Sequence, residues 1–193
     1  PAGGNSEKAD QAGGRERSQE QYEDWKQMRS VREKAEAARL ASHELSVLPT
    51  KKKNQALLAM ADALEAGLAE IEEANAKDLG AGKAKGLTPA MLDRLLLDRG
   101  RVQLMASNLR DVAALGDPVG TVLKAWTASN GMEMSRVRTP IGVIGLVYEA
   151  RPSVTTDTAA PCITAGNRTI RTGGAEAILY NPVLARRLSS AGL

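Results

Sequence analysis

The chain has 193 residues, of which 42% are hydrophobic and 25% are charged, a composition typical of a globular protein rather than a disordered or membrane-spanning one. Its 26 basic and 23 acidic residues alternate along the sequence and leave a net charge of +3. We therefore expect neither a nucleic-acid nor a membrane partner, because a nucleic-acid binder carries a patch of one sign. A single cysteine excludes an internal disulfide framework and is typical of a cytoplasmic protein.

The N-terminal half is expected to be helical after a disordered tail over residues 1–18, which are rich in glycine, alanine and charge. Residues 19–48 are strong helix formers with apolar side chains every three or four positions. A second helix is predicted to begin at Pro49-Thr50, with the threonine as its N-cap. The lysines at 51–53 are expected to be solvated.

Glycines at 80, 82 and 86 are expected to break the second helix. Thr88-Pro89 pairs a capping residue with a proline in the first turn, which predicts the start of another helix. Periodic apolar residues then continue to Leu115. Residues 19–115 are therefore predicted to form the helical N-terminal part of the protein.

Residues 116–140 are predicted to form a β-hairpin arm. Two extended segments, 121–127 and 132–139, flank Asn130-Gly131, which is a strong signal for a tight hairpin turn. The mixed face around Trp126 and the exposed edges of such a hairpin are consistent with a contact between copies of the chain.

Residues 141–193 predict the start of a parallel sheet. The continuous apolar run at 141–148 is typical of a central strand covered on both faces. A helix is expected within 153–165, followed by a short strand through Ile170 and a last helix to Leu193. The predicted fold class is therefore α/β, with an incomplete doubly wound parallel sheet, a helical N-terminal half and a hairpin arm. Two strands leave most of such a sheet unpaired, so we expect the chain to be the N-terminal portion of a longer protein.

The sequence offers no strong catalytic or metal-binding set. Cys162 and His43 lie on different predicted helices, and a nucleophile–base pair would need the fold to bring them together. A cysteine that packs inside its helix and a histidine at the surface are the favoured interpretations. No catalytic residue and no metal ligand are predicted.

Position in the sheet indicates a ligand site, because open parallel sheets bind ligands beyond the carboxyl ends of their strands. Both loops there offer a guanidinium, exposed glycine N–H groups and a following helix N-terminus, which suit an anionic nucleotide. The alternative is that the arginines are solvated and the glycines merely end turns. The residues predicted to bind the cofactor are Tyr148, Glu149, Ala150, Arg151, Pro152, Arg171, Thr172, Gly173, Gly174 and Glu176.

Several segments closely resemble the gamma-glutamyl phosphate reductase family of the aldehyde dehydrogenase superfamily. The densest match is RVRTPIGVIGLVYEARP at 136–152, and the similarity runs from about residue 33 to the end. Further matching segments are residues 48–64, 73–79, 92–97 and 112–120.

This resemblance implies a cytoplasmic, homo-oligomeric oxidoreductase of proline biosynthesis. It implies reduction of L-glutamate 5-phosphate to L-glutamate 5-semialdehyde with NADPH, and glutamate 5-kinase as a further partner. Residues 161–167, PCITAGN, resemble the end of a superfamily helix, so Cys162 does not match the family nucleophile. The resemblance places the catalytic cysteine in sequence that this chain lacks, and we expect no reductase activity from the chain alone. The alternative is a non-catalytic remnant that acts as an interaction or oligomerisation module.

The chain departs from the family pattern in both loops. Ser153 stands where the family commonly has asparagine. The family usually ends its second strand Val-Ile-Leu-Arg-Gly-Gly, whereas this chain reads TIRTGG at 169–174, with Thr172 at the basic position and Arg171 at the leucine. Either the strand shifts by one residue and presents Arg171 to the cofactor, or cofactor binding is impaired. Our hypothesis is that Arg171 replaces the missing base.

Overall fold

The computed structural model describes residues 31–148, 151–172 and 179–191. The predicted tail at 1–18 lies outside these residues, as does the first part of the predicted helix at 19–48, whose residues 31–46 are helical. No helix within the described ranges is both long and apolar enough to cross a membrane.

Four helices follow in the order α2 (Thr50–Ala66), α3 (Leu68–Ala84), α4 (Pro89–Leu95) and α5 (Arg99–Ala114). The predicted start of α4 is confirmed, because the Thr88 hydroxyl accepts a hydrogen bond from the Met91 N–H.

The predicted helix break at glycines 80 and 82 is wrong, since both residues lie inside α3. A Cβ at Gly82 would come within 2.8 Å of Leu87 Cδ1, so the glycine allows the following turn to pack closely. Of the three predicted breakers, Gly86 alone is outside a helix, with a φ of +78° that favours glycine.

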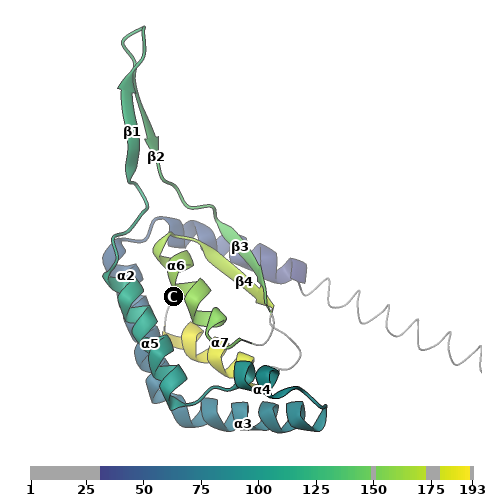
Figure 1. The fold of residues 1–193 in the computed structure, drawn as a ribbon. Coiled ribbons are helices and arrows are strands. Elements are labelled where there is room, and N and C mark those ends of the chain that lie inside the picture. The colour runs from purple at the N-terminus through teal and green to yellow at the C-terminus, as the bar shows by residue number, and fades with distance from the viewer. Residues whose placement is uncertain (1–30, 149–150, 173–178, 192–193) are drawn as a thin grey trace, which may run out of the picture.

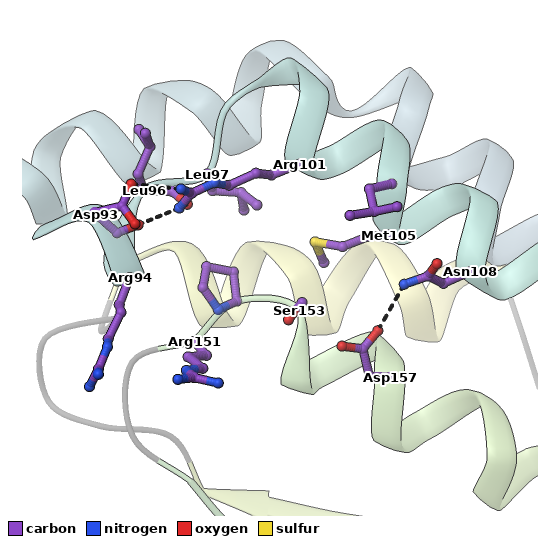
Figure 2. Close-up of a pocket in the computed structure, with 12 residues that line it drawn as sticks. Asp93, Arg94, Leu96, Leu97, Arg101, Met105, Asn108, Arg151, Ser153 and Asp157 are labelled. Carbon is purple, nitrogen blue, oxygen red and sulfur yellow. Dashed lines mark hydrogen bonds and ion pairs between the residues drawn. The ribbon is translucent and has the colours of Figure 1, made fainter. Parts of the chain in front are cut away.

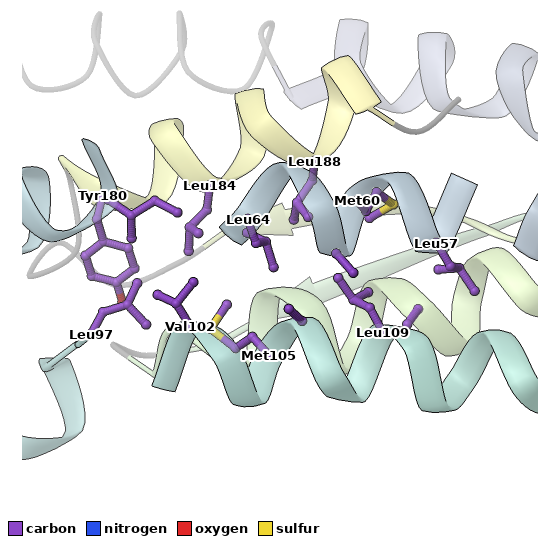
Figure 3. Close-up of a cluster of buried hydrophobic side chains, with 14 of the residues drawn as sticks. Leu57, Met60, Leu64, Leu97, Val102, Met105, Leu109, Tyr180, Leu184 and Leu188 are labelled. Atoms are coloured by element: carbon purple, nitrogen blue, oxygen red, sulfur yellow. The ribbon is translucent and has the colours of Figure 1, made fainter. Parts of the chain in front are cut away.

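The helices bury one apolar core (Figure 3). Its residues come from α2, α3 and α5, from α6 (Val154–Thr164) and α7 (Tyr180–Ala191), and from the turn around α4. The members are Leu57, Met60, Ala61, Leu64, Ile71, Leu95, Leu97, Val102, Met105, Ala106, Leu109, Ala113, Ala160, Tyr180, Leu184 and Leu188. Leu57 and Leu188, 131 positions apart in the chain, thus share one core, which positions α7 against α2.

Lys53 corrects the expectation that the lysines at 51–53 are solvated. Its side chain is 1% exposed, and Nζ donates hydrogen bonds to Asp117 Oδ2 at 2.9 Å and to the Thr164 carbonyl at 3.2 Å. Thr50 is not the N-cap either, because Pro49 stands at that position and Thr50 is the first helical residue, whose hydroxyl donates to the same Asp117 oxygen. The helical phase turns Lys53 inward, where it ties α2 to the root of the hairpin and to the end of α6.

Asp78 anchors α7 from α3. It is 2% exposed, and its carboxylate accepts hydrogen bonds from the N–H groups of Leu179 and Tyr180, the latter at 2.9 Å. The first N–H groups of a helix have no partner within the helix. A carboxylate a hundred residues away in sequence therefore caps this helix.

The predicted hairpin is present. Strands β1 (Val122–Thr127) and β2 (Glu133–Val137) pair antiparallel, and the hairpin projects away from the helical body (Figure 1). Every residue of both strands is exposed.

Strands β3 (Val143–Val147) and β4 (Arg168–Thr172) pair in parallel, with α6 as the crossover between them. The predicted strand–helix–strand–helix order of this region is therefore confirmed. The expectation that the apolar strand is covered on both faces is wrong for the described residues, because no residue of β3 is fully buried and Val147 is 87% exposed. Helices cover the faces of a parallel sheet, and the crossover helix α6 packs mainly on β4 rather than on β3.

Candidate functional site

The strands that precede the two loops predicted to bind a ligand, β3 and β4, end side by side at the same edge of the parallel sheet. Val147 lies opposite Thr172, and the Tyr148 N–H donates a hydrogen bond to the Thr172 carbonyl at 3.1 Å. The opposite ends of the strands are tied by Asn167, whose Oδ1 accepts from the N–H groups of Ile141 and Gly142 at 2.6 and 2.9 Å. The expected side-by-side arrangement of the strands is therefore confirmed.

Half of the predicted cofactor-binding residues lie in the described part of the chain: Tyr148, Arg151, Pro152, Arg171 and Thr172. The others are outside it and stay predictions: Glu149, Ala150, Gly173, Gly174 and Glu176.

Tyr148 and Arg171 converge on the first turn of α6. The Tyr148 hydroxyl and Thr155 Oγ1 share a hydrogen bond of 2.7 Å, and Arg171 Nη1 donates to the Thr155 carbonyl at 2.7 Å. Burial lowers the pKa of the Arg171 guanidinium, but an arginine in a protein stays charged. Arg171 lies opposite Leu146 in the strand register. Its half-buried guanidinium donates to the Thr155 carbonyl and pairs with no carboxylate of the described residues.

A cavity of about 550 Å³ lies beside β4, between residues of the 31–46 helix and α7. Lys34 and Arg171 supply two positive charges to its lining, which contains no acidic residue. Asn181 also lines it, and its buried Oδ1 has no hydrogen-bond partner among the described residues. The cavity therefore suits an anionic ligand that can also donate a hydrogen bond.

Arg151 and Pro152 line a different cavity, of about 500 Å³, between α4, α5 and the start of α6 (Figure 2). Arg94 and Arg101 lie on the same cavity. Arg151 and Arg171 were predicted to share one ligand because their loops are neighbours, but their side chains line separate cavities. Arg94 and Arg101 were missed because isolated charges on a helix carry no signal of their own.

Cys162 is half-buried in α6, and burial raises the pKa of its thiol, partly offset by the charge of Arg171. A raised pKa makes a cysteine a weaker nucleophile at neutral pH, because the thiolate is the reactive form. His43 is exposed on the 31–46 helix. No cluster of three or more His, Cys, Asp or Glu residues that could hold a metal occurs among the described residues.

Comparison with known proteins agrees with the resemblance seen in the sequence. The gamma-glutamyl phosphate reductase of Moorella thermoacetica is 53% identical over 161 residues, which cover 83% of this chain and 38% of that protein. The solved gamma-glutamyl phosphate reductase of Thermotoga maritima superposes with a TM-score of 0.80 at 35% identity, over 82% of this chain and 38% of that one. The chain is homologous to part of gamma-glutamyl phosphate reductase.

The chain thus spans less than two fifths of the length of these reductases. A solved NAD-dependent benzaldehyde dehydrogenase from Corynebacterium glutamicum has a TM-score of 0.64 at 20% identity, over 82% of this chain and 32% of that one, which shows the aldehyde dehydrogenase fold. The predicted α/β, aldehyde dehydrogenase-like class is therefore confirmed, whereas the doubly wound sheet stays a prediction. No family model matches the chain.

Proposed function

We propose that this chain is the N-terminal, cofactor-domain portion of an NADPH-dependent reductase that converts L-glutamate 5-phosphate to L-glutamate 5-semialdehyde in cytoplasmic proline biosynthesis. The observation that carries the proposal is the parallel pairing of β3 with β4 in a chain 53% identical to a gamma-glutamyl phosphate reductase. That pairing sets the carboxyl ends of β3 and β4 side by side, and open α/β sheets bind nucleotides beyond such strand ends.

The residues at this edge fit a nicotinamide dinucleotide. Its phosphates would meet the charges of Arg171 and Lys34, and its hydroxyl groups are donors that the unpartnered Asn181 Oδ1 would accept. The cofactor supplies the hydride in this class of reaction, and the protein supplies binding and orientation. The NAD-dependent benzaldehyde dehydrogenase shares the fold and uses this class of cofactor by its name. The preference for NADP follows from the reductase resemblance.

The described residues of this chain would bind and orient rather than perform bond-breaking steps. Cys162 is a poor thiolate, because burial raises its pKa. We place the nucleophilic cysteine in the part of the reductases that this chain does not span. We expect the purified chain to oxidise no NADPH in the presence of L-glutamate 5-phosphate, and rapid oxidation would contradict this assignment.

The second candidate is an interaction or oligomerisation module. The specific observation in its favour is the hairpin, whose strands are exposed along their whole length and carry Trp126 and Met134 side by side. Partners of this surface would be a second copy of the chain, and glutamate 5-kinase as the resemblance implies.

Cofactor binding separates the two candidates. A ligand that binds only the folded state raises its stability, by about 2.7 kcal/mol at a hundredfold excess over Kd. We expect NADPH to raise the thermal midpoint of the chain, and Arg171→Ala to reduce that rise relative to its own ligand-free midpoint. Arg99→Ala, an exposed arginine on α5, is the matched control and should leave the rise unchanged. If NADPH shifts neither protein, the interaction module is favoured.

A further inference from the structure

The cavity between α4, α5 and the start of α6 combines an apolar floor with a basic rim. Leu97 and Met105 are 2% and 1% exposed, and Pro152 is buried beside them. Three arginines, Arg94, Arg101 and Arg151, line the cavity. Its volume of about 500 Å³ lies within the range of small-molecule sites.

Both acidic residues in the lining of this cavity have a polar partner, and the three arginines outnumber them by one. Asp93 pairs with Arg101, whose Nη2 lies 2.7 Å from Asp93 Oδ1 and whose Nη1 donates to the Leu96 carbonyl at 2.9 Å. Asp157 accepts a hydrogen bond from Asn108 Nδ2 at 3.3 Å.

Arg94 and Arg151 are the two arginines of the cavity lining that are not paired with Asp93. Neither makes a hydrogen bond or ion pair within the described part of the chain, and Figure 2 shows both side chains on the side of the cavity away from α5. Two guanidinium groups at one cavity, neither paired with a carboxylate of the described residues, are suited to a phosphate group, which accepts paired hydrogen bonds from arginine.

We infer that this cavity is a subsite for the phosphate group of a small phosphorylated carboxylic acid, held by Arg94 and Arg151. The inference deepens the proposed function and rests on it for the identity of the ligand, L-glutamate 5-phosphate. It assigns Arg151 to the substrate and leaves Arg171, in the other cavity, to the cofactor. Leu104, which lines the cavity and is 61% exposed, contacts the short carbon chain of the acid.

The test uses the 193-residue chain with inorganic phosphate as the probe, titrated by calorimetry at constant ionic strength. We expect phosphate to bind, and Arg94→Gln and Arg151→Gln each to weaken it at least tenfold. Both side chains are exposed, so equal far-UV circular dichroism and ligand-free midpoints verify that the variants fold. Arg99→Gln, an exposed arginine outside the cavity, is the matched control and should bind like the parent.

A gain-of-binding variant makes the test sharper. Asp93→Asn removes the carboxylate charge beside Arg101, so that Nη2 of Arg101 is free of its ion pair while Nη1 keeps the Leu96 carbonyl. We expect a several-fold tighter affinity for phosphate in this variant. Unchanged or weaker binding would contradict the charge assignment at the cavity.

Two further probes distinguish the possible failures. L-glutamate, which carries carboxylates and no phosphate, should bind more weakly than phosphate, and the reverse order would overturn the assignment to a phosphate group. Arg151→Gln should keep the NADPH-induced rise in the thermal midpoint. If this variant loses that rise but still binds phosphate, Arg151 contacts the cofactor and not the phosphate group. If NADPH fails to bind the parent while phosphate binds through Arg94 and Arg151, the subsite stands and the proposed reductase function fails. No phosphate binding by the parent chain would overturn the subsite itself.

Discussion

The helical body and the strands of this protein differ in how completely their side chains are buried. The core residues of α2, α5 and α7 are at most 7% exposed and are covered by one another. The hairpin strands are exposed throughout, and β3 has no fully buried residue despite its apolar sequence. The helices therefore complete a core within the described chain, whereas the strands form their hydrogen bonds without a matching apolar cover.

The largest expected effect lies in the helical body. Leu64 is 0% exposed in α2, and Leu64→Ala should lower the free energy of unfolding by about 4 kcal/mol, since it removes buried methyl groups and leaves a cavity. Leu58 on the same helix is 43% exposed, and Leu58→Ala should cost under about 1 kcal/mol. Urea denaturation measures both. Equal losses for the two variants would show that the body is not a packed core.

The link between the two regions should have the next largest effect. Lys53→Met leaves the carboxylate of Asp117 without its buried cation and should destabilise the protein by about 3 kcal/mol. Lys52→Met changes the exposed neighbour on the same helix and should leave the unfolding midpoint nearly unchanged. A midpoint for Lys53→Met that matches Lys52→Met would mean that the hairpin root is not anchored through this pair.

The same pair should make stability depend on pH. Burial opposes ionisation of Asp117, but hydrogen bonds from Lys53, the Val119 N–H and Thr50 outweigh it, so the pKa of the carboxyl lies below its usual value. A lowered pKa contributes stability at pH above the usual carboxyl value of about 4, and this contribution disappears as the pH falls through the lowered pKa. We expect the parent to be more stable than Asp117→Asn at pH 7, with the difference shrinking toward pH 3. A constant difference over that range would contradict the linkage.

The smallest effect is expected in the hairpin. Trp126 lies opposite Met134, with Lys124 Nζ 5.5 Å from its ring centre, and none of these residues is buried. Trp126→Ser should therefore change the free energy of unfolding by under about 0.5 kcal/mol. If the hairpin is a contact between copies, the same substitution should lower the sedimentation-determined mass at high concentration. A large loss of stability in a monomeric sample would show that the hairpin packs on the body instead.

Local signals in the sequence were sufficient for most elements. Asn130-Gly131 predicted the hairpin turn, Thr88-Pro89 predicted the start of α4, and the apolar run predicted β3. Local signals failed where packing competes with propensity. Gly82 stays inside α3 because a close contact with Leu87 favours it there, and Asp78 caps α7 across a hundred residues of sequence.

The location of the candidate site was predictable from the sequence, but its separation into two cavities was not. The sequence placed both loops at one sheet edge, because parallel strands end on the same side. It assigned Arg151 and Arg171 to one ligand, whereas the structure sets them on separate cavities. Side-chain direction depends on what α4, α5 and α6 bring alongside, and no spacing along the chain encodes that.

Short segments of the chain were enough to predict the α/β class, the hairpin, the order of the last four elements and the family resemblance, because turn chemistry, apolar period and motif are local properties. The tertiary structure alone decided which lysine of three is buried, what caps α7 and which arginines share a cavity. Those outcomes depend on contacts between segments far apart in the chain, where burial and hydrogen bonding select one arrangement among many that local preference allows.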